Sequence, residues 1–77
     1  MNEYFDAVAE AISEVTGRPV ATLAAAQSLR ADLGIDSLQI WEVVVGIEEQ
    51  LHLRIPDADI AKWQTVGDAV AYLEGRA

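Results

Sequence analysis

The stretch DLGIDSL, residues 32–38, lies at the boundary between two parts of the chain. A long irregular segment ends in it, and the most apolar helix that the sequence predicts begins there. Gly34 permits a left-handed turn just before that helix. Asp36 and Ser37 are residue types that commonly begin helices, so either can cap this one by accepting a hydrogen bond from a first-turn N–H group. The other role open to Ser37 is to carry an anionic group, because a helix N-terminus presents free N–H groups and partial positive charge.

The helix predicted over residues 37–52 has two apolar faces. At about 100° per residue, a core stripe is formed by Ile40, Val43, Val44, Ile47 and Leu51. The opposite face mixes apolar side chains with carboxylates: Leu38, Trp41, Glu42, Val45, Glu48, Glu49 and His52. An exposed apolar patch rimmed by charge is typical of a protein-docking surface. The alternative is that the long loop folds over Trp41 and buries it.

Helices are also expected on both sides of this one. A first helix follows the candidate cap Asn2 and ends at Gly17. A short helix is expected over residues 57–62, because the residue before Pro56 avoids helical geometry. A last helix begins at Thr65, which with Asp68 resembles a capping box, and ends at Gly75.

The connection between the first two helices, over residues 17–36, is much longer than the usual link of about 2–8 residues. Residues 21–27 are expected to form a turn or two of helix. Five apolar side chains are expected to pin the connection to the core: Val20, Leu23, Leu29, Leu33 and Ile35. The sequence thus predicts an all-α fold, a small four-helix bundle of three main helices plus one short helix.

Length and charge restrict the function. A chain of 77 residues makes a single domain, residues 1–77, with little room for a deep catalytic cleft. With 13 acidic and 5 basic residues the net charge is −8, which repels nucleic acid and anionic membranes and attracts basic protein surfaces. The alternative is that the acidic surface serves solubility alone. No apolar run reaches the roughly 18 residues of a membrane span and no signal peptide is evident, so we expect a cytoplasmic protein.

The residues that support catalysis or metal binding are missing. Cysteine is absent, so any thiol must come from an attached group. His52 is the only histidine, which leaves no plausible zinc cluster. Ser37 lacks a G-x-S-x-G elbow, and His52 lies about four helical turns away from it. We therefore expect no catalytic site, no metal site and no enzyme activity.

The motif at residues 32–38, followed by Glu42, Glu48, Glu49 and the Ile55-Pro56-Asp57 run, resembles the discrete acyl carrier proteins of fatty-acid and polyketide synthesis. The resemblance covers essentially all 77 residues. It implies that Ser37 is esterified with 4′-phosphopantetheine, taken from coenzyme A by a phosphopantetheinyl transferase. Acyl groups would then be held on this arm as thioesters and presented to acyl-transferring, ligase and synthase enzymes with basic docking patches.

The resemblance also assigns roles to neighbouring residues. Asp36 and Leu38 flank the modified serine and help the transferase recognise it. Docking positions are Glu42, Val45, Glu48 and Glu49, beside Leu38 and Trp41 of the apolar patch. Part of an acyl chain would be sheltered by a cavity lined by Ile40, Val44, Ile47 and Ile60. A monomer is expected.

Several residues depart from the pattern of the family. Trp41 is bulkier and Ile40 more apolar than expected, and Gly46 replaces a frequent alanine at a cost of up to about 1 kcal/mol of helix propensity. Trp63 and Thr65 are similar to residues in carriers of D-alanine or other aminoacyl cargo. An aminoacyl or peptidyl carrier is therefore one alternative, and an unmodified helical adaptor that binds a partner through Leu38, Trp41 and Val45 is another.

Overall fold

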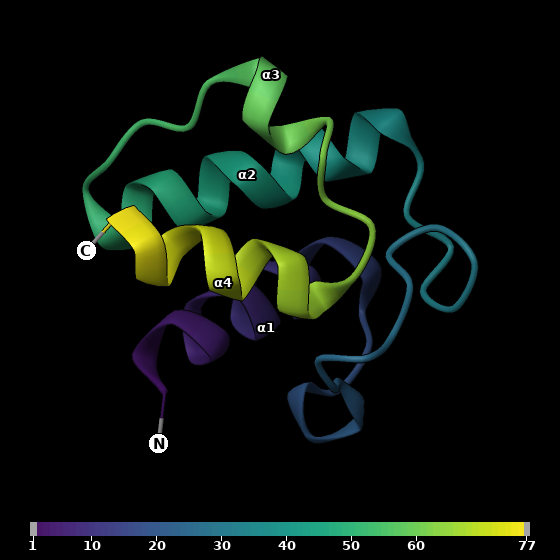
Figure 1. Ribbon diagram of the computed structural model, residues 1–77. Helices are drawn as coiled ribbons and strands as arrows, with labels where there is room; N and C mark the ends of the chain where they lie inside the picture. The colour runs from purple at the N-terminus through teal and green to yellow at the C-terminus, as the bar shows by residue number, and fades with distance from the viewer. Residues whose placement is uncertain (1, 77) are drawn as a thin grey trace.

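The computed structural model describes residues 2–76, which form a bundle of α-helices (Figure 1). The helices are α1 (Glu3–Thr16), α2 (Ser37–Leu51), α3 (Asp57–Ile60) and α4 (Val66–Arg76), with a 3₁₀ turn η1 (Val20–Thr22) in the long loop. The predicted fold of three main helices, one short helix and a long loop between the first two main helices is confirmed. Within the described residues the only β-type pairing is an isolated bridge between Ser28 and Thr65.

The core lies between α1, α2 and α4, and α1 packs against both of the other long helices. Small side chains on α1, Ala7, Ala9 and Ala11, are buried and allow this close approach. The stripe predicted for α2 is buried at its centre, while Ile40 and Leu51 are half-buried at its ends. The largest fully buried side chains come from all three helices: Val8, Ile12, Val43, Val44, Ile47, Val66 and Leu73.

The helix starts follow the sequence pattern closely. The Asn2 side chain caps α1 by accepting hydrogen bonds from the Tyr4 and Phe5 N–H groups at 2.9 and 3.1 Å. At α4 the Asp68 N–H donates to Thr65 Oγ1 at 3.1 Å, and the Thr65 N–H donates to Asp68 Oδ2 at 3.0 Å. The predicted capping box at Thr65 and Asp68 is thus confirmed, with Asp in the position that Glu or Gln usually takes.

Several helix ends differ from the prediction. His52 lies beyond α2 in the left-handed region, with φ 56° and ψ 49°. The short helix ends at Ile60, because Lys62 and Trp63 donate to carbonyls three residues back rather than four. Gly75 does not end α4, which continues to Arg76, since among the described glycines only Gly17 and Gly34 adopt positive φ.

The long loop is anchored as predicted by Leu23, Leu29, Leu33 and Ile35, which are buried. Val20 is 40% exposed, so its predicted role as an anchor is wrong. The turn or two of helix expected at residues 21–27 is confirmed only at its start, where the 3₁₀ helix η1 covers Val20–Thr22 and Thr22 and Leu23 donate to carbonyls three residues back; the rest of the stretch is not helical.

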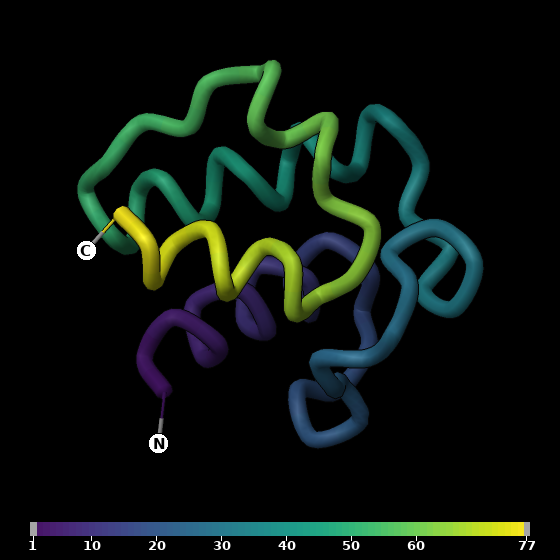
Figure 2. Tube along the Cα trace, viewed as in Figure 1, coloured from purple at the N-terminus to yellow at the C-terminus, as the bar shows by residue number. Residues whose placement is uncertain are grey.

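Hydrogen bonds tie the loop to the segment that leads into α4. The Leu29 N–H donates to Gln64 O at 2.9 Å, the Val66 N–H to Gln27 O at 3.0 Å, and the Gly67 N–H to Ala25 O at 2.8 Å. Figure 2 shows the two segments running beside each other at the end of the bundle where α2 begins. These bonds fix the long loop, which leads into α2, against the start of α4.

Candidate functional site

Asp36 is the residue that caps α2. Its Oδ1 accepts a hydrogen bond from the Gln39 N–H at 2.8 Å, and Gln39 Oε1 accepts one from the Asp36 N–H at 3.2 Å. This reciprocal capping box satisfies one of the free donors of the first turn and fixes where the helix begins. Of the two residues that the sequence offered as caps, the structure thus uses Asp36.

Ser37 is the first residue of α2 and is exposed. Because Asp36 does the capping, the Ser37 hydroxyl takes part in no hydrogen bond within residues 2–76. His52 follows the far end of α2, about 22 Å away at 1.5 Å per residue, so it cannot act as a base for this hydroxyl. Among the described residues no group of three or more His, Cys, Asp or Glu side chains is placed to hold a metal ion.

These features fit a phosphate ester at Ser37. The hydroxyl is reachable from solvent, and the N-terminus of a 15-residue helix offers its remaining N–H groups and partial positive charge to an anion. No neighbouring side chain competes for the hydroxyl. A separate enzyme would have to supply the base and the phosphate donor.

The outer face of α2 carries the exposed apolar patch. Leu38 is 70% exposed, Trp41 52% and Val45 40%, so the long loop does not fold over Trp41. Glu42 and Glu49 are exposed beside these residues. The arrangement is that of an apolar centre with an acidic rim.

Glu48 differs from the other two carboxylates of this face. It is half-buried, and its Oε2 accepts a hydrogen bond from the Ile55 N–H at 2.7 Å. Ile55 is itself a core residue, so this bond ties the connection between α2 and α3 to the body of α2. The sequence assigned Glu48 to docking alone and did not reveal this contact, which depends on how the chain turns at His52.

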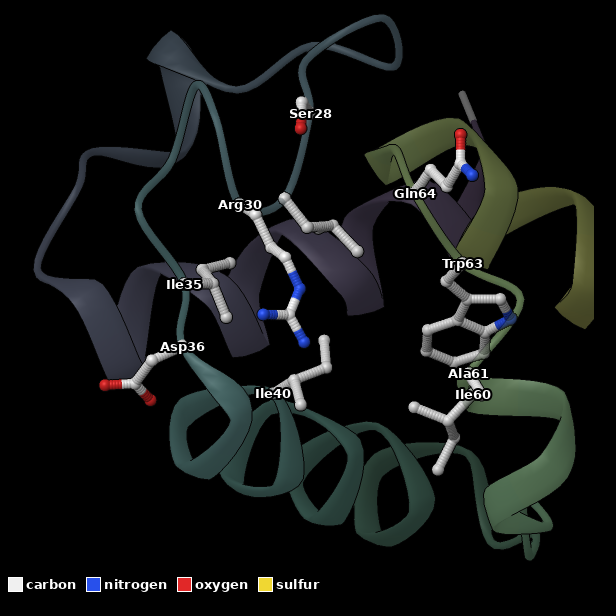
Figure 3. A pocket seen from close by; sticks show the side chains of 10 residues that line it. Ser28, Arg30, Ile35, Asp36, Ile40, Ile60, Ala61, Trp63 and Gln64 are labelled. Atoms are coloured by element: carbon white, nitrogen blue, oxygen red, sulfur yellow. The ribbon is translucent and has the colours of Figure 1, made fainter.

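A cavity of about 440 Å³ opens next to the start of α2 (Figure 3). Of the four predicted cavity residues, Ile40 and Ile60 line it, whereas Val44 and Ile47 are buried in the packed core and do not. The remaining lining comes mostly from the long loop and from the segment between α3 and α4: Ser28, Leu29, Arg30, Ile35, Asp36, Ala61, Trp63 and Gln64. These residues could not be predicted from the sequence, because they come together only through the hydrogen bonds between the two segments.

The structure is a small helical domain with an exposed serine, Ser37, at the start of α2. Residues 6–73 match the family model described as a phosphopantetheine attachment site. The chain belongs to this family, whose acyl carrier members are carriers and not catalysts.

Relatives place the chain among the acyl carrier proteins. An acyl carrier protein of Kineococcus radiotolerans is 45% identical over 71 residues, which cover 92% of this chain and 88% of that one. A meromycolate extension acyl carrier protein of Mycobacterium tuberculosis is 42% identical over 72 residues, which cover 94% of this chain and 63% of that protein.

A solved structure shares the fold. It comes from Mycobacterium tuberculosis, is provisionally described as an acyl carrier protein, and superposes with a TM-score of 0.87 over 96% of this chain and 99% of the other at 24% sequence identity. Within residues 2–76 none of the helices has the length and apolar character needed to cross a bilayer.

Proposed function

We propose that the chain, acting as one carrier domain over residues 1–77, holds acyl groups as thioesters on a 4′-phosphopantetheine arm at Ser37. It presents them to enzymes of fatty-acid or polyketide-type biosynthesis. The observation that supports this most is the free, exposed Ser37 hydroxyl at a helix start that Asp36 already caps. The arm, when attached, supplies the thiol that the cysteine-free chain lacks.

Attachment requires a group transfer from coenzyme A. The Ser37 oxygen bonds to the phosphorus that bears pantetheine, the bond from that phosphorus to the nucleotide phosphate breaks, and adenosine 3′,5′-bisphosphate leaves. The hydroxyl proton passes to a base of the transferase, because His52 is out of reach. Asp36 contributes by fixing the helix start, and Leu38, which is 70% exposed, contributes a surface for the transferase.

Partner enzymes would dock on the outer face of α2. Leu38, Trp41 and Val45 supply an apolar contact, and Glu42 and Glu49 with the net charge of −8 attract basic patches. Glu48 contributes its charge while holding Ile55. The same charge opposes self-association and contact with nucleic acid or anionic membranes, which supports a cytoplasmic monomer.

The cargo is more consistent with a fatty-acid type than with an aminoacyl type. Relatives described as meromycolate extension acyl carrier proteins support this assignment. The two residues that pointed to aminoacyl carriers have structural explanations here, since Thr65 caps α4 and Trp63 lines the cavity.

Incubation with coenzyme A and a broad-specificity phosphopantetheinyl transferase, followed by intact-mass measurement, tests the proposal. We expect one phosphopantetheinyl group on the native chain and on Ser13→Ala, and none on Ser37→Ala. Absence of any mass gain would favour the unmodified adaptor. Loading by aminoacyl ligases in preference to acyl ligases would replace the fatty-acid assignment.

A further inference from the structure

Arg30 is the one cationic residue that lines the cavity beside Ser37. Figure 3 shows its guanidinium directed into the space between the loop and α2 on one side and the segment after α3 on the other. The cavity's other charged residue, Asp36, turns its carboxylate away from this space and uses it to cap α2. The cavity therefore presents a single inward charge.

The Arg30 guanidinium is also uncommitted. Within residues 2–76 the hydrogen bonds donated by arginine side chains come from Arg18 and Arg76, and Arg30 takes part in none of them. Arg30 is an exposed residue at the cavity, whose lining includes the apolar side chains of Leu29, Ile35, Ile40, Ile60 and Trp63. The guanidinium offers five N–H donors in a planar fork that can bind a carboxylate, and the apolar side chains of the lining can contact the alkyl chain that bears it.

Such an anion must be delivered on a tether. A net charge of −8 repels free anions from the domain, whereas attachment at Ser37 places a cargo beside the cavity at high effective concentration. The arm's own phosphate is bonded to Ser37, which does not line the cavity, so the far end of the cargo is the better match for Arg30.

We propose that Arg30 is a specificity-determining residue that makes this cavity select acyl cargo with a terminal carboxylate over cargo with a methyl end. The proposal rests on the proposed function of Ser37. It concerns the chemistry of the cargo terminus and involves no change to the attachment step.

The test loads Ser37 from two coenzyme A analogues, each carrying an eight-carbon acyl chain linked to the arm by an amide. One chain, octanoyl, ends in a methyl group and the other ends in a carboxylate. Intact mass first verifies loading. The melting temperature and the Arg30 Nε–Hε signal in NMR spectra are then compared for the apo, holo and two loaded forms. Arg30→Gln removes the guanidinium, and Arg54→Gln removes the same charge from a residue that is likewise exposed but lies outside the cavity.

We expect the carboxylated cargo to shift the Arg30 signal and to raise the melting temperature by about 2–4 °C over octanoyl. Arg30→Gln should abolish the difference and Arg54→Gln should keep it. Equal melting temperatures for the two cargoes, or a difference that survives Arg30→Gln, would overturn the proposal. A full Arg30 shift in the holo form without cargo would overturn it in favour of the arm's phosphate. Failure to load Ser37 at all would instead refute the proposed function, and the mass measurement identifies that case.

Discussion

Replacing Glu48 by alanine separates the two roles of the acidic face of α2. The Glu48 carboxylate accepts the Ile55 N–H at 2.7 Å, and this bond is partly buried. Removal leaves the N–H of a core residue without its partner, which costs about 1–3 kcal/mol. Glu42 and Glu49 are exposed and take part in no hydrogen bond of this kind, so their alanine variants should stay within about 0.5 kcal/mol of the native chain.

Urea unfolding followed by circular dichroism measures these differences, and Glu48→Gln is the matched control. Its amide oxygen can still accept the Ile55 N–H, so it should keep most of the stability while losing the charge. In docking assays with a basic partner enzyme, Glu48→Gln, Glu42→Gln and Glu49→Gln should each weaken binding, with a loss that shrinks as salt is raised. Equal stability of Glu48→Ala and Glu42→Ala would refute the structural role of Glu48.

Three further outcomes follow from the structure. Gly46→Ala should stabilise the chain by about 0.5–1 kcal/mol in a urea unfolding titration, since the added Cβ would meet its nearest side chain at 3.4 Å, an ordinary contact. Gly67→Ala should stabilise it less or destabilise it, because there the added Cβ would lie 3.1 Å from a backbone oxygen. Hydrogen bonds from backbone N–H groups, that of Gln64 foremost, hold the pKa of Asp68 below its ordinary value of 3.8. The stability this provides is present above the ordinary value and is lost as pH falls through the folded pKa, so Asp68→Asn should flatten the acid limb of a stability–pH curve. Tyr72→Phe removes the hydroxyl that donates to Asp59 of α3 at 2.8 Å, so the substitution should speed amide hydrogen exchange in α3 more than in α1. Unchanged exchange rates in α3 would contradict this role of Tyr72.

The three long helices and the position of Ser37 at the start of the second could be predicted from local rules. Asn2, Gly17, Asp36 and Thr65 mark helix boundaries through hydrogen bonds or backbone angles that involve only neighbouring residues. Helical periodicity also placed Leu38 and Trp41 on the outer face of α2, but it left open whether the loop covers Trp41, which the structure shows to be exposed. Gly75 misled the prediction because a glycine ends a helix only when its backbone turns left-handed, and here it does not.

Apart from Ile40 and Ile60, the lining of the cavity could not be predicted, because it depends on contacts between distant segments. Leu29 and Ile35 reach it only after the loop has bonded to Gln64 and to the start of α4. Glu48 likewise gained a structural partner, Ile55, from the path of the chain after α2. Periodicity predicts which residues share one face of a helix, but it does not predict contacts between segments that are distant in the sequence.

The most direct test of the central claim is to locate the attached group after treatment with coenzyme A and transferase. Fragmentation of the intact protein in a mass spectrometer assigns the added mass to a residue. We predict one phosphopantetheinyl group on Ser37 and none on Ser13 or Ser28. An unmodified Ser37, or an equal mass gain in Ser37→Ala, would contradict it.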